Sequence, residues 1–121
     1  MTDTPASVRQ DLYDVIRPVA DTGRVQVLDL VPTPGNARSP LICIDYDGFR
    51  FDEVEWTFPV RLYVRASDAG TEQAQRQLEE LLGAVDAAVG AESWRISGQA
   101  GYLPDMDCWI GDFRVLIPRV L

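Results

Sequence analysis

The fold of this chain is decided between residues 55 and 66, where the sequence reads EWTFPVRLYVRA. Every even position from Trp56 to Ala66 carries an apolar side chain, whereas the odd positions are mixed. This period of two is typical of a β-strand that buries one of its faces. Pro59 has no N–H to donate to a ladder, so we expect an edge of the sheet there.

The residues before this strand predict a break and a protruding hairpin. Phe49 and Phe51 occupy odd positions, so the apolar face changes side, and a bulge or loop between Asp52 and Glu55 would explain the change. An unbroken strand over residues 49–66 would extend about 55 Å at ~3.3 Å per residue. That length exceeds the roughly 35 Å expected for a globule of this size. We therefore expect the hairpin to leave the domain as an arm.

The strongest turn signal in this region is the Asp-Gly pair at 47–48. A two-residue turn there would follow a short buried strand over residues 41–44. It would place Ile44 opposite Phe51, a sensible apolar pair between antiparallel strands.

Two amphipathic helices flank the strands. The first shows an apolar face over residues 8–19, behind a capping box formed by Ser7 and Gln10. The second repeats the same apolar spacing over residues 74–85, and Gly83 is expected to end it early.

Shorter apolar runs predict the remaining strands at residues 25–31, 94–96 and 108–120, with a loop at 98–107. Together these elements predict a single α+β domain over residues 1–121. Its sheet is largely antiparallel and four- to five-stranded, with the two amphipathic helices packed on one face, plus the protruding β-hairpin.

The composition is that of an ordinary globular protein, with 46% hydrophobic and 25% charged residues. Acidic residues outnumber basic residues by 19 to 11, which gives a formal net charge of −8. Such a surface repels phosphate, so we expect no tight binding around nucleic acid, although DNA could pass through a ring of such subunits. No apolar run could cross a bilayer and the N-terminus does not resemble a signal peptide. We therefore expect synthesis in a cytoplasm and no membrane partner.

Residue types needed for common catalytic chemistry are missing from the sequence. It contains no histidine, which removes most nucleophile–base pairs and histidine-ligated metals. Cys43 and Cys108 are expected to be buried and reduced. Asp105 and Asp107 could ligate a hard cation, but solvated loop carboxylates in an acidic chain are the simpler interpretation. We therefore expect no enzyme activity, no cofactor and no metal.

Arginines recur along three of the predicted strands. Isolated arginines that alternate with apolar residues are usually the solvated side of a sheet. This interpretation applies to Arg61, Arg65, Arg95, Arg114 and Arg119.

The run WTFPVRLYVRASD at residues 56–68, followed by residues 73–82, resembles the tail terminator (minor tail, neck) proteins of long-tailed bacteriophages. The order of elements is also similar over nearly the whole chain. The resemblance implies a structural subunit of the virion that forms a hexameric ring, with its sheets toward the lumen and no catalytic residues. Such a ring stops polymerisation of the tail tube and joins the tail to the head. The implied partners are other copies of the chain, the tail tube protein, the head–tail connector or head-closure protein, and DNA that only passes through the lumen.

A protruding hairpin is the element with which such a subunit would reach a neighbour or the tube. We therefore hypothesise a contact element over residues 45–55, joined by two arginines of the following strand. The candidate interface residues are Asp45, Tyr46, Asp47, Phe49, Arg50, Phe51, Asp52, Glu53, Glu55, Arg61 and Arg65.

Three alternatives stay open. Within the virion, the chain could be another neck component, such as a head-closure or head–tail adaptor protein. A cytoplasmic, non-catalytic binding module would predict a monomer or dimer with a concave pocket. A small hydrolase or nuclease acting through Asp105 and Asp107 would predict activity that requires Mg²⁺ or Mn²⁺.

Overall fold

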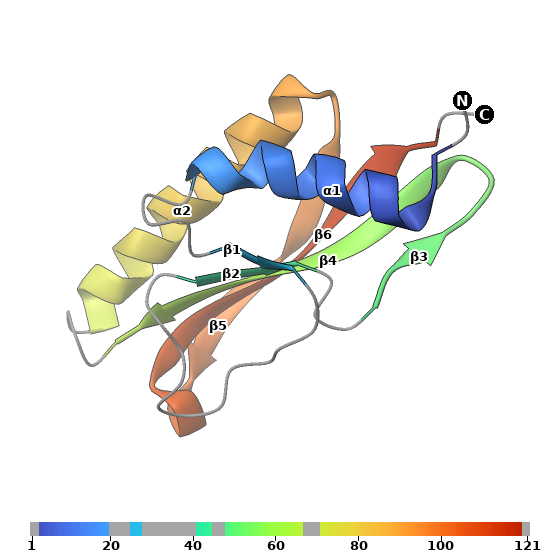
Figure 1. Ribbon diagram of the computed structural model, residues 1–121. Coiled ribbons are helices and arrows are strands. Elements are labelled where there is room, and N and C mark those ends of the chain that lie inside the picture. The colour runs from blue at the N-terminus through green and yellow to red at the C-terminus, as the bar shows by residue number, and fades with distance from the viewer. Residues whose placement is uncertain (1–2, 20–24, 28–40, 45–47, 67–70, 120–121) are drawn as a thin grey trace.

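The computed structural model describes residues 3–19, 25–27, 41–44, 48–66 and 71–119. These residues form an α+β fold, as predicted (Figure 1). In chain order the elements are α1 (Pro5–Ile16), η1 (Arg17–Val19), β1 (Val25–Val27), β2 (Leu41–Ile44), β3 (Arg50–Phe51), β4 (Glu55–Arg65), α2 (Thr71–Ala91), β5 (Arg95–Leu103), η2 (Pro104–Met106) and β6 (Cys108–Pro118).

The strands form one sheet in the spatial order β1-β2-β4-β6-β5, and the short β3 pairs with β4 off this path. β1 runs parallel to β2, and the other pairs are antiparallel. Both helices cover the same face of the sheet (Figure 1). The predicted architecture, a largely antiparallel sheet with two helices on one side, is therefore confirmed. We call the opposite face, which carries the odd-numbered side chains of β4, the second face.

The stretch that decides the fold is β4, the central strand of the sheet. It pairs along its whole length with β6, from Glu55↔Pro118 to Arg65↔Cys108. Its even-numbered side chains belong to the main core together with apolar residues of both helices. Burying each large apolar side chain contributes roughly 1.5–3 kcal/mol. The fully buried residues of this strand on the helix side are Phe58, Val60, Leu62 and Val64.

Pro59 lies in this central strand and pairs with Arg114 of β6, so β4 as a whole is not an edge strand, but no described strand pairs with Pro59 on its other side. The β2 ladder on one side of β4 ends at the pair Ile44↔Val60. The β3 ladder on the same side begins with Arg50↔Thr57. On this side Pro59 therefore falls in the gap between two partner strands, as expected for a residue that cannot donate to a ladder.

The hairpin is formed by β3 and β4, and the chain reverses just after Asp52. The register predicted for a turn at 47–48 is therefore wrong. Phe51, expected opposite Ile44, pairs with Trp56 instead. The loop predicted between Asp52 and Glu55 is confirmed, and it forms the hairpin turn. The Asp52 carboxylate accepts backbone N–H groups there and fixes the reversal of the chain.

Helix α1 begins three residues earlier than predicted. The Ser7 N–H donates to Thr4 Oγ1 at 3.1 Å, and the Thr4 N–H donates to Ser7 Oγ at 3.0 Å. Pro5 occupies the first helical position, where an N–H would have no helical partner. The predicted Ser7–Gln10 capping box is wrong, since Gln10 Nε2 instead donates to Asp14 Oδ1 at 2.9 Å.

Helix α2 runs without interruption through Gly83 and ends at Ala91, so the predicted early end is wrong. A glycine inside a helix costs about 1 kcal/mol relative to alanine. Burial of Val85 and Val89 in the turns beyond it outweighs that cost.

Residues 98–103 belong to β5 rather than to the predicted loop. The strand pairs with β6 over nine residues, from Arg95 to Leu103. A Cβ added at Gly98 would lie 2.3 Å from the Asp112 carbonyl oxygen. The glycine that favours a loop in the sequence is therefore required in the strand for close packing against β6.

Candidate interaction surface

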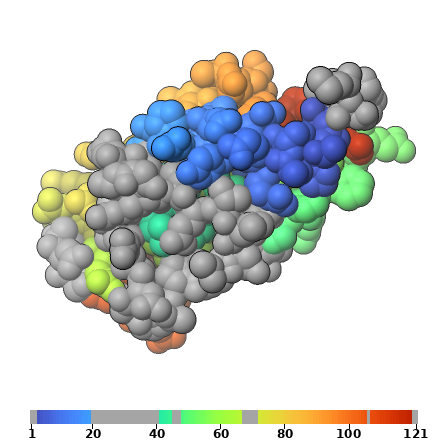
Figure 2. Space-filling model, viewed as in Figure 1, coloured from blue at the N-terminus to red at the C-terminus, as the bar shows by residue number. Residues whose placement is uncertain are grey.

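The β3–β4 hairpin ends in a tip that exposes two large apolar side chains. We define the hairpin tip as residues 50–55. Phe51 is 62% exposed and Val54 is 68% exposed, the highest values among the large apolar side chains that the structure describes. The hairpin projects at the end of the molecule where α1 starts and β6 ends (Figure 1), and its atoms stand out from the surface in Figure 2.

The hairpin tip is braced by Arg119, which follows β6. The guanidinium lies over the rings of Phe51 and Trp56, at 5.5 and 5.0 Å from their centroids. It also donates to the Asp52 carbonyl oxygen at 2.5 Å, and the Arg119 N–H donates to the Val54 carbonyl oxygen at 2.8 Å. An element that is ordered before binding loses less conformational freedom on binding.

Asp52 fixes the turn at the centre of the hairpin tip. Its Oδ1 accepts the backbone N–H groups of Val54 and Glu55, each at 2.8 Å. Its own N–H donates to the Glu55 carbonyl oxygen at 3.0 Å. The two N–H groups hold the pKa of the Asp52 carboxyl below its ordinary value, and Arg119 acts in the same direction.

The predicted contact residues fall on different parts of the molecule. Phe49 turns inward: its ring is stacked on Phe58 at 5.4 Å between centroids, and the Arg9 guanidinium lies 5.6 Å from its centroid. Three lie outside the described residues, namely Asp45, Tyr46 and Asp47. The hairpin tip brings together Arg50, Phe51, Asp52, Glu53 and Glu55.

Arg61 and Arg65 lie away from the hairpin tip, on the second face of the sheet. The strand register gathers further arginines on this face, which the sequence spacing alone did not reveal. The additional members are Arg50, Arg95 and Arg114.

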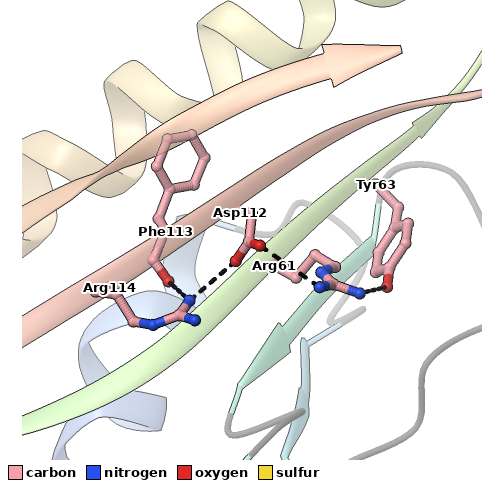
Figure 3. Close-up of polar contacts among 5 residues, drawn as sticks. All are labelled: Arg61, Tyr63, Asp112, Phe113 and Arg114. Atoms are coloured by element: carbon pink, nitrogen blue, oxygen red, sulfur yellow. Dashed lines mark hydrogen bonds and ion pairs between the residues drawn. The ribbon is translucent and has the colours of Figure 1, made fainter. Parts of the chain in front are cut away.

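A polar network crosses the second face between β4 and β6 (Figure 3). Arg61 forms an ion pair with Asp112 at 3.6 Å and donates from Nη1 to Tyr63 Oη at 3.3 Å. Arg114 Nη1 pairs with Asp112 Oδ1 at 2.9 Å and donates to the Phe113 carbonyl oxygen at 3.2 Å. Partly exposed ion pairs of this kind contribute at most about 1 kcal/mol each. The network therefore orients side chains along the two central strands.

A second, smaller core lies on the same face and includes both cysteines. The two thiols are free and buried, as predicted. Burial raises the pKa of the Cys43 thiol to about 11, despite the opposing effect of Arg61. Because the thiolate is the reactive form, Cys43 is poorly suited to act as a nucleophile. The members of this core are Leu41, Cys43, Tyr63, Cys108 and Ile110.

A groove of about 440 Å³ runs between α2 and β5. Its apolar lining includes Leu82, Ile96 and Phe113, and its carboxylates are Glu79 and Asp86. Sequence reasoning missed this groove because it ended the helix at residue 82 and placed residues 98–103 in a loop. Sequence reasoning also missed that Val54 is exposed in the hairpin tip. It missed as well that Arg119, which follows β6, contacts the tip.

Of the two carboxylates considered for cation binding, Asp105 lies in η2 and Asp107 is bonded to a tyrosine. The Tyr102 hydroxyl donates to Asp107 Oδ1 at 2.5 Å, and this bond raises the pKa of Tyr102. Asp107 has a left-handed backbone and links η2 to β6. Within the described ranges, no group of three or more Cys, Asp or Glu side chains could hold a metal ion. Neither described helix is long and apolar enough to cross a membrane.

Comparison with known proteins yields no relative: no family model and no curated protein matches this chain.

Proposed function

We propose that this chain is a non-catalytic structural subunit that forms a ring at the head-proximal end of a phage tail. The ring ends polymerisation of the tail tube and joins the tail to the head connector. The observation that carries the proposal is the hairpin tip. It presents Phe51 and Val54 to solvent on an element held by Arg119 and Asp52. Large apolar side chains gathered on one exposed, ordered element are a typical feature of a protein contact.

The resemblance of residues 56–68 and 73–82 to tail terminator proteins supplies the specific role. In this role the chain contacts further copies of itself, the tail tube protein and the connector or head-closure protein. DNA passes through the lumen and is not a ligand.

Deleting the gene from the genome that encodes the chain tests the role directly. A terminator is expected to leave tails of uncontrolled length that carry no heads, seen by electron microscopy of the lysate. Supplying the chain in trans should restore defined tails. Tails of normal length without heads would favour another neck position, and complete particles would contradict the proposal.

A second candidate function is a cytoplasmic binding module, and the groove between α2 and β5 is the observation that favours it. Its volume of about 440 Å³ lies within the roughly 300–1,000 Å³ of pockets that take small molecules. This alternative predicts a monomer or dimer and a small ligand that contacts Glu79 or Asp86.

A further inference from the structure

We propose that the hairpin tip of one copy binds in the groove between α2 and β5 of the next copy. This inference rests on the proposed ring and names the contact that closes it. Phe51 and Val54 supply the apolar anchors, and the groove supplies an apolar lining with acidic side chains beside it.

The two surfaces match in chemical character. Phe51 and Val54 are the most exposed large apolar side chains among the described residues, and the groove is lined by apolar groups of both α2 and β5. The Arg119 guanidinium lies over the Phe51 ring at 5.5 Å from its centroid. The groove offers carboxylates, which are the natural partners of guanidinium groups. Apolar anchors with complementary charges around them are typical of specific protein contacts.

In its own chain the tip does not fill the groove, because Phe51 and Val54 stay exposed. The groove lies beside Gly98, which is level with Phe113 and, across β6, with Val60. The tip meets β5 through the ion pair of Glu55 with Arg95 at 3.1 Å, which lies on the second face, opposite the groove. Contact between two different surfaces of identical chains is head-to-tail. Repetition of a head-to-tail contact with a closing rotation generates a ring.

The outer edge of β5 adds backbone groups to this contact. Among the described strands β5 pairs only with β6, and its other edge has no described partner strand. A nine-residue edge with no partner among the described strands is a template for pairing with another chain. Seating the tip of a neighbour in the groove places a second chain beside this edge.

Gly83 provides a steric test, because it lines the groove at an exposed helical position. Gly90 lies in the same helix outside the groove and serves as the matched control. At both glycines an added Cβ would meet no heavy atom of the described residues within 4 Å. Gly83→Gln and Gly90→Gln should therefore both fold, which circular dichroism and thermal unfolding verify. Gly83→Gln is expected to lower the association constant by roughly tenfold or more, whereas Gly90→Gln should assemble as the wild type does.

Cross-linking tests the pairing of the two surfaces. Val54→Cys protein and Gly83→Cys protein are mixed under mild oxidation, with both native thiols shielded by burial. A covalent dimer is expected in the mixture, and neither variant alone should give one at a comparable rate. If the wild type and Gly83→Gln both form rings and no cross-linked mixed dimer appears, this contact is overturned while the proposed function stands. A wild type that stays monomeric at every concentration and also in the presence of the tail tube protein, with no mixed dimer, would overturn both.

Discussion

At the scale of single residues, the hairpin tip depends on two polar side chains that serve its backbone. Asp52 accepts two N–H groups within the turn, and Arg119 reaches the turn from the end of β6. The guanidinium is planar, so it stacks on the rings of Phe51 and Trp56 while it donates to a carbonyl. The conformation of an exposed loop is thereby tied to the central sheet.

Replacing Arg119 with alanine is expected to lower the free energy of unfolding by about 1 to 2 kcal/mol, through loss of the cation–π contacts and the hydrogen bond. Arg119→Lys keeps the charge but loses the planar stacking, so it should recover only part of the loss. Denaturant unfolding of the three proteins measures the difference. Equal stability of wild type and Arg119→Ala would show that the brace has no energetic role.

Stability of the hairpin tip should depend on pH through Asp52. The pKa of this carboxyl is lowered in the folded chain from an ordinary value of 3.8. Its stabilising effect is therefore fully present above that value and is lost as the pH falls through the lower folded pKa. Unfolding of wild type and Asp52→Ala from pH 7 to pH 2 should give a difference that is constant near neutrality and shrinks below about pH 4. A difference that persists unchanged at pH 2 would rule out this role of the carboxylate.

At the scale of elements, the sequence predicts those parts that burial alone determines. The period of two in β4 and the apolar stripes of α1 and α2 define the layers, because each must bury one face. The register of the hairpin could not be predicted, since the Asp-Gly pair at 47–48 and Asp52 are competing turn signals of similar local strength. The hairpin tip lies within the predicted contact element, but Arg119 contacts it from 67 residues away in sequence. The groove depends on β5, whose glycines signal a loop until the pairing with β6 is known.

Two glycines in these elements should respond in opposite ways to alanine. Gly83→Ala is expected to stabilise the protein by about 1 kcal/mol, because alanine is the better helix former and no described atom crowds the site. Gly98→Ala is expected to destabilise it by about 1 to 3 kcal/mol, because its Cβ would overlap the backbone of β6. Thermal unfolding distinguishes the two changes. Similar shifts for both would contradict the described packing of β5 on β6.

At the scale of the whole molecule, charge is divided between the two sides of the sheet. The second face carries arginines of three strands, with Asp112 and Glu55 as the opposing charges on β4 and β6. Helix α2 carries one arginine, Arg76, against a set of exposed carboxylates: Glu72, Glu79, Glu80 and Asp86. The net charge of −8 therefore describes neither side. A ring with its sheets toward the lumen would turn the arginine-bearing second face, rather than the acidic α2, toward the DNA.

The mass of the purified protein tests the central claim, assembly into a closed ring, most directly. Light scattering after size exclusion should be recorded from low to high concentration, alone and with the tail tube protein of the same phage. We expect the mass to rise with concentration, or on the tube, to a plateau of roughly 80 kDa for six chains of 13.5 kDa, since closed symmetric assemblies are the norm. A strict monomer or dimer under all of these conditions would contradict the ring and favour the binding module.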